Sequence, residues 1–199
     1  MTVWFTSDLH LGHENIIEHQ GRPFRDAEHM AQALIANINS VVLQRDTLYI
    51  LGDFTMKVNG KEAARLRHRI NCREVHLVRG NHDKKWQGET CPFSTVSDYL
   101  EIRLGPDRVG TVLMHYPIEH WNGSHHGSIH LHGHIHARSL ELRQHPGRDL
   151  AMPGRDHGSD RAIRQPPDLV TALPATQAHP TDALEISEHV PRLLRLHQR

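Results

Sequence analysis

The sequence contains little cysteine and no excess of charge of either sign. Its 199 residues include two cysteines, Cys72 and Cys91, which are too few for a disulfide framework and do not form a CxxC pair. We therefore expect no zinc knuckle and a reducing compartment, the cytoplasm. Lysine plus arginine and aspartate plus glutamate each number 23, so the formal net charge is zero. A nucleic-acid partner is thus not indicated by bulk basicity, although a local basic patch would still permit one.

Long apolar runs and late aromatic residues are also missing. No run approaches the roughly 20 residues that span a bilayer, and the first ten residues lack the basic and apolar regions of a signal peptide. We expect neither a membrane partner nor a signal peptide.

No aromatic residue follows Trp121, and seven of the 11 prolines follow His145. This shift predicts a domain over 1–140 and a divergent tail over 141–199, rich in Pro, Arg and His and loose or partly disordered.

Within the first 140 residues, the pattern predicts alternating strands and helices, and therefore an α/β fold. A capping Asp26 precedes apolar residues at helical spacing, and several short apolar runs each end at a polar cluster. Strands are predicted at 2–7, 47–51, 74–78, 108–114 and 128–132, and helices at 26–42 and 60–70.

Histidine is abundant, with 20 residues, and much of the chemistry follows the predicted strands. In open α/β sheets, ligands bind at the carboxyl ends of the strands. Seven side chains there offer oxygen or nitrogen donors to a metal, enough for two ions if one carboxylate bridges them. Two divalent ions would leave excess positive charge, which favours a phosphate group. The seven are Asp8, His10, Asp53, Asn81, His115, His134 and His136, and His82 lies beside them.

These motifs, in this order, resemble the calcineurin-like metallophosphoesterase superfamily. They are Asp8-x-His10, Gly52-Asp53, the string GNHD at 80–83, an isolated His115 and the string GHIH at 133–136. The longer strings SDLHLGHENII and GRPF are similar to a small phosphoesterase branch found in bacteria and phages. The resemblance covers about residues 2–138.

The resemblance implies a two-sheet αββα sandwich and in-line hydrolysis of a phosphate mono- or diester by a metal-bridging hydroxide. The cofactors would be two divalent ions, with Mn, Fe, Zn, Ni and Co all suited to such ligands. The substrate would be a phosphate ester, with nucleotides among the candidates. The implied roles are Asp8, His10 and His136 on the first ion, Asp53 bridging, Asn81, His115 and His134 on the second, and His82 as the catalytic residue facing the phosphate.

Two other functions stay open on the sequence. A nuclease of the same superfamily would use the same site, and a His-rich metal-binding protein without catalysis would need neither His82 nor a bridging Asp53. The tract HHGSIHLHGHIH at 125–136 favours the metal-binding protein, because a strand there would place alternate histidines on one face. Of this tract, we expect His125, His126 and His130 to be solvated or to lie behind the ligands.

Several further residues have open roles. His13 could face the substrate or lie on the surface, and Arg22 could meet a phosphate or a surface carboxylate. Asp83 could orient His82 or bond the adjacent backbone. The tail lacks the Asn-Val-Gly-x-Asp type of segment that related phosphoesterases carry after GHxH, so one hypothesis is divergence or a frameshift beyond about residue 142.

Overall fold

The computed structural model describes residues 1–84 and 92–136, and the backbone of 169–172 and 194–196. The predicted boundary at residue 140 and the tail beyond it therefore lie, apart from these two short strands, outside the described residues and stay predictions. Within the described residues, no helix is both long enough and apolar enough to cross a membrane.

The predicted strands and helices are all present, with ends shifted by up to two residues. The strands among them are β1 (Val3–Thr6), β2 (Thr47–Ile50), β3 (Glu74–Val78), β6 (Val109–Met114) and β7 (Ile129–Leu131), and the helices are α2 (Ala27–Val41) and α3 (Gly60–His68). The Asp26 carboxylate caps α2 by accepting a hydrogen bond from the His29 amide, as its position predicted.

Other elements gave no clear signal in the sequence. They are α1 (Glu14–His19), β4 (Thr95–Ser97), β5 (Tyr99–Leu104), the 3₁₀ helix η1 (Ser124–His126), β8 (Leu169–Ala172) and β9 (Leu194–Leu196). Along β5 alternate residues are exposed, and the strand carries charged Glu101 and Arg103, so its apolar content is low.

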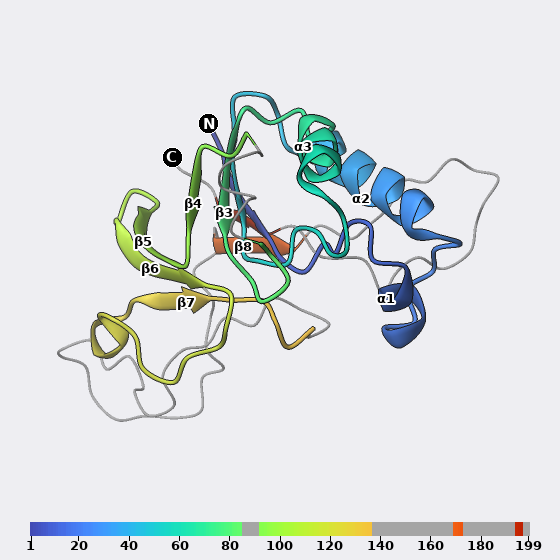
Figure 1. Ribbon diagram of the computed structural model, residues 1–199. Helices are drawn as coiled ribbons and strands as arrows, with labels where there is room; N and C mark the ends of the chain where they lie inside the picture. Colours follow the sequence, from blue (N-terminus) through green and yellow to red (C-terminus); the bar gives the residue numbers. More distant parts are fainter. Residues whose placement is uncertain (85–91, 137–168, 173–193, 197–199) are drawn as a thin grey trace, which may run out of the picture.

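The larger sheet has six strands in the order β4-β3-β2-β1-β9-β8. Strands β1 to β4 are parallel, and β9 and β8 continue the sheet antiparallel beyond β1. Strands β1, β2 and β3 lie side by side in sequence order, and the connections between parallel strands are right-handed. Helices α2 and α3, which make these connections, are therefore expected on the same face of the sheet. Figure 1 shows both helices on one side of these strands, with β5, β6 and β7 on the other.

The second sheet, in the order β5-β6-β7, covers the face of the larger sheet that the helices leave open. Its strands β5 and β6 are antiparallel, whereas β6 and β7 are parallel. Phe5, Leu51 and Val78 from the larger sheet and its loops form a buried cluster with Leu113 and Leu131 from the smaller one. The molecule is therefore a mixed α/β fold with two packed sheets.

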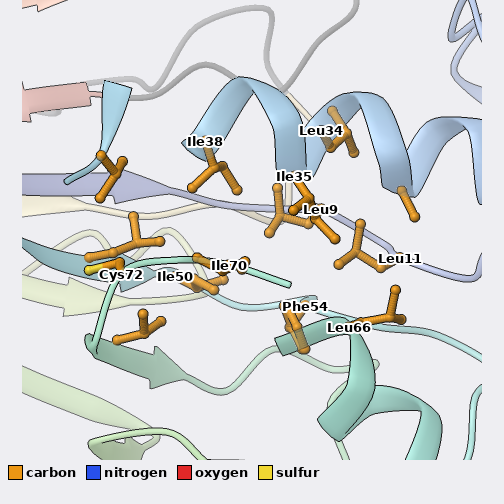
Figure 2. Close-up of a cluster of buried hydrophobic side chains, with 14 of the residues drawn as sticks. Leu9, Leu11, Leu34, Ile35, Ile38, Ile50, Phe54, Leu66, Ile70 and Cys72 are labelled. Atoms are coloured by element: carbon orange, nitrogen blue, oxygen red, sulfur yellow. The ribbon is translucent and has the colours of Figure 1, made fainter. Parts of the chain in front are cut away.

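The main core lies between the helices and the larger sheet and extends beneath the polar residues after β1. Leu34, Ile35 and Ile38 lie on the sheet side of α2, near Leu9 and Leu11 (Figure 2). Each buried leucine or isoleucine contributes about 1.5–3 kcal/mol to stability. Because Leu9 and Leu11 alternate with Asp8 and His10, burying the leucines fixes the segment that carries the two metal-capable side chains.

Candidate metal centre

Backbone hydrogen bonds join the loop after β1 to the loop after β2. The amides of Asp8, His10 and Leu11 donate to the carbonyl oxygens of Gly52, Asp53 and Phe54 at 3.0, 2.8 and 3.0 Å. Parallel pairing of β1 and β2 thus continues beyond the strands, and it holds Asp8, His10 and Asp53 at one edge of the sheet.

The backbone at the centre adopts an uncommon conformation. Of the seven non-glycine residues with positive φ in the described part of the chain, five are predicted ligands. Left-handed backbone is unfavourable for residues with a side chain and gathers at functional sites. The five, with φ between 48° and 71°, are Asp8, His10, Asp53, His134 and His136.

Two motif glycines allow this close packing. Gly52 has φ +89°, and a Cβ there would collide with the His115 ring. A Cβ on Gly80 would collide with the Asp53 side chain and would lie 2.6 Å from the Asp53 amide nitrogen. A larger residue at either position would displace a predicted ligand, which explains the glycine in both Gly52-Asp53 and Gly80-Asn81.

A first donor cluster comprises Asp8, His10, Asp53 and His136. One ligand atom from each lies within 4.8 Å of the others. The Nε2 atom of His10 is 3.2 Å from Nε2 of His136 and 3.6 Å from Oδ2 of Asp53. Two carboxylates and two imidazoles converging in this way form a set that could hold a divalent ion.

A second cluster adjoins the first through the same Asp53 oxygen. Oδ2 of Asp53 is 3.5 Å from Nε2 of His115, which is itself 3.1 Å from Oδ1 of Asn81. The same Asn81 oxygen lies 3.0 Å from Nδ1 of His134. His115 Nδ1 lies 2.9 Å from the Leu51 carbonyl oxygen, so as donor there it would leave Nε2 as a lone pair facing the cluster. The structure thus brings all seven predicted ligands together.

His82 lies beside both clusters. Its Nε2 atom is 3.9 Å from Oδ2 of Asp53, its side chain is 32% exposed, and its ring meets that of His10 edge-on at 5.3 Å. The His82 amide donates to the other Asp53 oxygen, Oδ1, at 2.9 Å. The ring therefore lies beside the two clusters and reaches solvent, and we call this exposed side of the centre its mouth.

The protonation of the histidines suits metal binding. Burial lowers the pKa of His10 from 6.5 to about 2, and the positive charge of Arg22 acts in the same direction. Burial also lowers the pKa of His136, although the Asp8 carboxylate opposes this effect. Both rings are therefore neutral near pH 7, which is the form that coordinates a metal.

Two charged residues hold the ligand loops in place. The Arg22 guanidinium is buried and donates to the carbonyl oxygens of Asp8 and Leu9 at 2.8 and 3.1 Å. Arg22 is thus buried against backbone carbonyl oxygens rather than paired with a surface carboxylate, which was one of the two roles expected from the sequence. Its other expected role, contact with a phosphate, stays a prediction. Asp83 accepts from the Gly80 amide at 2.9 Å, which is the expected bond to the adjacent backbone. It also accepts from the distant amides of Asp53 and Phe54 at 2.9 and 3.0 Å.

The histidine tract departs from the expected strand. β7 ends at Leu131, and His134 and His136 follow with left-handed backbone, so the tract does not present four histidines on one face. His130 is fully buried rather than solvated, with Nδ1 at 3.2 Å from the Val112 carbonyl oxygen and Nε2 at 3.2 Å from that of Tyr116. His125 and His126 in η1 are exposed, as expected.

Comparison with known proteins identifies relatives along most of the chain. No family model matches. The uncharacterized protein MJ1445 of Methanocaldococcus jannaschii is 34% identical over 139 residues, which cover 70% of this chain and 72% of that protein. The chain belongs to the same family as MJ1445. The Gene 66 protein of Mycobacterium phage L5 is 30% identical over 168 residues, covering 71% of this chain and 80% of the phage protein.

Two solved structures are also similar to this chain. The protein AQ665 of Aquifex aeolicus, of unknown function, is 34% identical with a TM-score of 0.49, over 58% of this chain and 61% of that one. YfcE, a phosphoesterase from E. coli, is 20% identical with a TM-score of 0.45, over 74% of this chain and 79% of that one.

Proposed function

We propose that this protein hydrolyses a phosphate ester, a mono- or diester, at a centre of two divalent metal ions. One observation carries the proposal: a single buried oxygen of Asp53 faces both donor clusters, at 3.6 Å from His10 Nε2 and 3.5 Å from His115 Nε2. A carboxylate between two sets of donors is the arrangement that a bridged metal pair requires.

The residues present fit such a pair. Asp8, His10 and His136 would hold one ion and Asn81, His115 and His134 the other, with Asp53 shared. Mixed oxygen and imidazole donors suit first-row divalent metals, including manganese, and disfavour Ca²⁺. When bound, the two ions would supply Lewis acidity towards the phosphate oxygens and lower the pKa of a water molecule.

The chain itself would supply three further contributions. The rigid loops after β1 and β2 orient the donors, and Arg22 and Asp83 hold those loops. His82, which belongs to neither donor set, reaches the mouth where the phosphate would lie. From there it can stabilise negative charge or give a proton to the departing oxygen. Figure 1 shows α2 and α3 on one side of the larger sheet and β5 to β7 on the other, and we propose the αββα sandwich as the full arrangement.

One assay tests the proposal directly. Purified protein is incubated with p-nitrophenyl phosphate, bis(p-nitrophenyl) phosphate and p-nitrophenyl phenylphosphonate, each with Mn²⁺ and with a chelator. Hydrolysis that depends on Mn²⁺ and stops with chelator supports the proposal, and the preferred ester separates a monoesterase from a diesterase or nuclease. Tight metal binding without hydrolysis of any ester would instead indicate a metal-binding protein.

A matched control excludes a contaminating phosphatase. Wild type, His82→Ala and His126→Ala are purified in the same way. His126→Ala is the control because His126 is an exposed histidine in η1. Only His82→Ala should lose activity. Equal activity in all three preparations would show that the hydrolysis does not come from this centre.

A further inference from the structure

His13 is a third histidine at the mouth of the centre, next to His10 and His82. Its ring centroid is 5.6 Å from that of His10 and 6.3 Å from that of His82. The His13 amide donates to the His10 carbonyl oxygen at 3.0 Å. The tight turn from His10 to His13 therefore places this ring beside the ligands, although His13 belongs to neither donor cluster.

The backbone around His13 is firmly fixed. The Met56 amide donates to the Leu11 carbonyl oxygen at 3.1 Å, and Leu11 pairs with Thr55 in an isolated parallel bridge. Gly12 has φ +83° and lies so close to Val58 that a Cβ on it would collide with that side chain. The position of the His13 ring is therefore set by two interlocked loops.

Within the described part of the chain, the structure shows no polar role for this ring. His13 is the N-cap residue of α1, yet its side chain forms no capping hydrogen bond. The residue is 7% exposed, and its Nδ1 atom is buried without a hydrogen-bond partner among the described residues. Burying an imidazole without such bonds costs free energy unless a ligand or a water molecule supplies the missing hydrogen bond.

We propose that His13 binds the substrate, donating a hydrogen bond to a non-bridging oxygen of the same phosphate group that His82 faces. This inference rests on the proposed function. N–H···O bonds span about 2.7–3.2 Å, so rings 6.3 Å apart lie close enough for one phosphate group to accept from both. Lys57, whose charge acts on His13, adds to the positive potential at this side of the mouth.

The test measures phosphate binding rather than turnover alone. Inorganic phosphate is titrated calorimetrically into Mn²⁺-loaded wild type, His13→Leu, His13→Gln and His19→Ala, and metal content is measured by elemental analysis. His13→Leu keeps apolar packing but removes both ring nitrogens, His13→Gln restores an N–H donor, and His19 is an exposed histidine in α1.

We expect His13→Leu to bind phosphate about 10–100-fold more weakly, as for a lost hydrogen bond to a charged group. His13→Gln should recover part of this loss, and His19→Ala should match wild type, all with unchanged metal content and thermal unfolding midpoint. In steady-state assays, the KM for p-nitrophenyl phosphate should rise more than kcat falls.

Three results would overturn the assignment. Wild-type phosphate affinity in His13→Leu would reduce His13 to a packing role. Metal loss in His13→Leu and in His13→Gln would make His13 a support of the metal centre. A wild-type protein that neither binds phosphate nor hydrolyses esters would refute the proposed function and this inference with it, whereas the first two results refute the inference alone.

Discussion

At the scale of single residues, Asp53 and His82 have opposite expected relations to the metal. Asp53 is almost fully buried and faces both donor clusters through one oxygen. The His82 side chain is partly exposed, and its Nε2 atom lies 3.9 Å from Oδ2 of Asp53. Substitutions at these two positions should therefore separate metal binding from chemistry.

Asp53→Asn should lose metal and activity together. The amide keeps the shape of the side chain but removes the negative charge that two cations would share. Loss of a residue that only supports a metal ligand typically lowers metal affinity about 10–100-fold. The fall in metal affinity of Asp53→Asn should be larger than this. Elemental analysis after gel filtration measures it, with Asp107→Asn, an exposed turn residue, as the control. Two ions per chain in Asp53→Asn would rule out the bridge.

His82→Ala should retain the metal and the fold but turn over about 10²–10⁴-fold more slowly, as is typical for loss of a general acid or charge stabiliser. The loss should be larger for an alkyl phosphate than for p-nitrophenyl phosphate, because p-nitrophenolate leaves without a proton. Steady-state kinetics with both esters and metal analysis test this. Loss of metal would make His82 a ligand, and unchanged kcat with both esters would remove its catalytic role.

At the scale of elements, the centre depends on two loops whose shape is held from outside the motifs. Arg22 follows α1 and reaches back to the carbonyl oxygens of Asp8 and Leu9, while its Nη1 atom also lies 3.4 Å from the Met30 sulfur in α2. Arg22 therefore joins α2 to the loop that carries Asp8 and His10. Burial lowers the pKa of Arg22 to about 10, so the guanidinium stays charged near neutral pH.

Arg22→Met should weaken both stability and metal binding. The thioether fills much of the space but leaves two buried carbonyl oxygens without their donor, at a cost of about 1–3 kcal/mol. Urea unfolding and Mn²⁺ titration measure the two effects. Arg25→Met is the control, since Arg25 is 80% exposed and pairs only with the neighbouring Asp26 in the described structure. Equal behaviour of the two variants would show that Arg22 does not hold the loop.

At the scale of the whole molecule, stability should depend on pH through the buried histidines. The pKa of His10 falls from 6.5 to about 2 on folding, so the unfolded chain binds a proton below about pH 6.5 that the folded chain refuses. Stability is thus complete above 6.5 and declines as the pH falls towards the folded value, by about 1.4 kcal/mol per pH unit for one proton. Lowered pKa of His136 adds to this decline.

Urea unfolding of metal-free protein from about pH 8 to about pH 5 would measure this slope, and His10→Asn should reduce it. Metal should compete with the same protons, so activity should fall in acid as metal is released. A stability that is constant across this range, or an activity that is flat with unchanged metal content, would contradict the expected protonation.

The sequence by itself determined the motifs of this protein and its strands β1, β2, β3, β6 and β7 with the helices α2 and α3. Apolar spacing and the capping Asp26 located α2, and short apolar runs that end at Asp8, Asp53 and Asn81 located β1, β2 and β3. These features could be predicted because they depend on neighbours within a few residues. Parallel strands also align their carboxyl ends, so the sequence could indicate that the seven donors would converge.

Only the tertiary structure decided how those donors are held and which other histidines join them. Arg22 and Asp83 act on backbone groups 13 to 30 residues away, and His130 is buried by a contact with Val112 across the smaller sheet. The sequence around Arg22 and Asp83 is polar and resembles an exposed loop. A side chain's burial depends on what the fold packs over it, so the local sequence does not reveal it. The same holds for His13: its motif is visible in the sequence, but its place beside His82 arises only when two loops from different strands interlock.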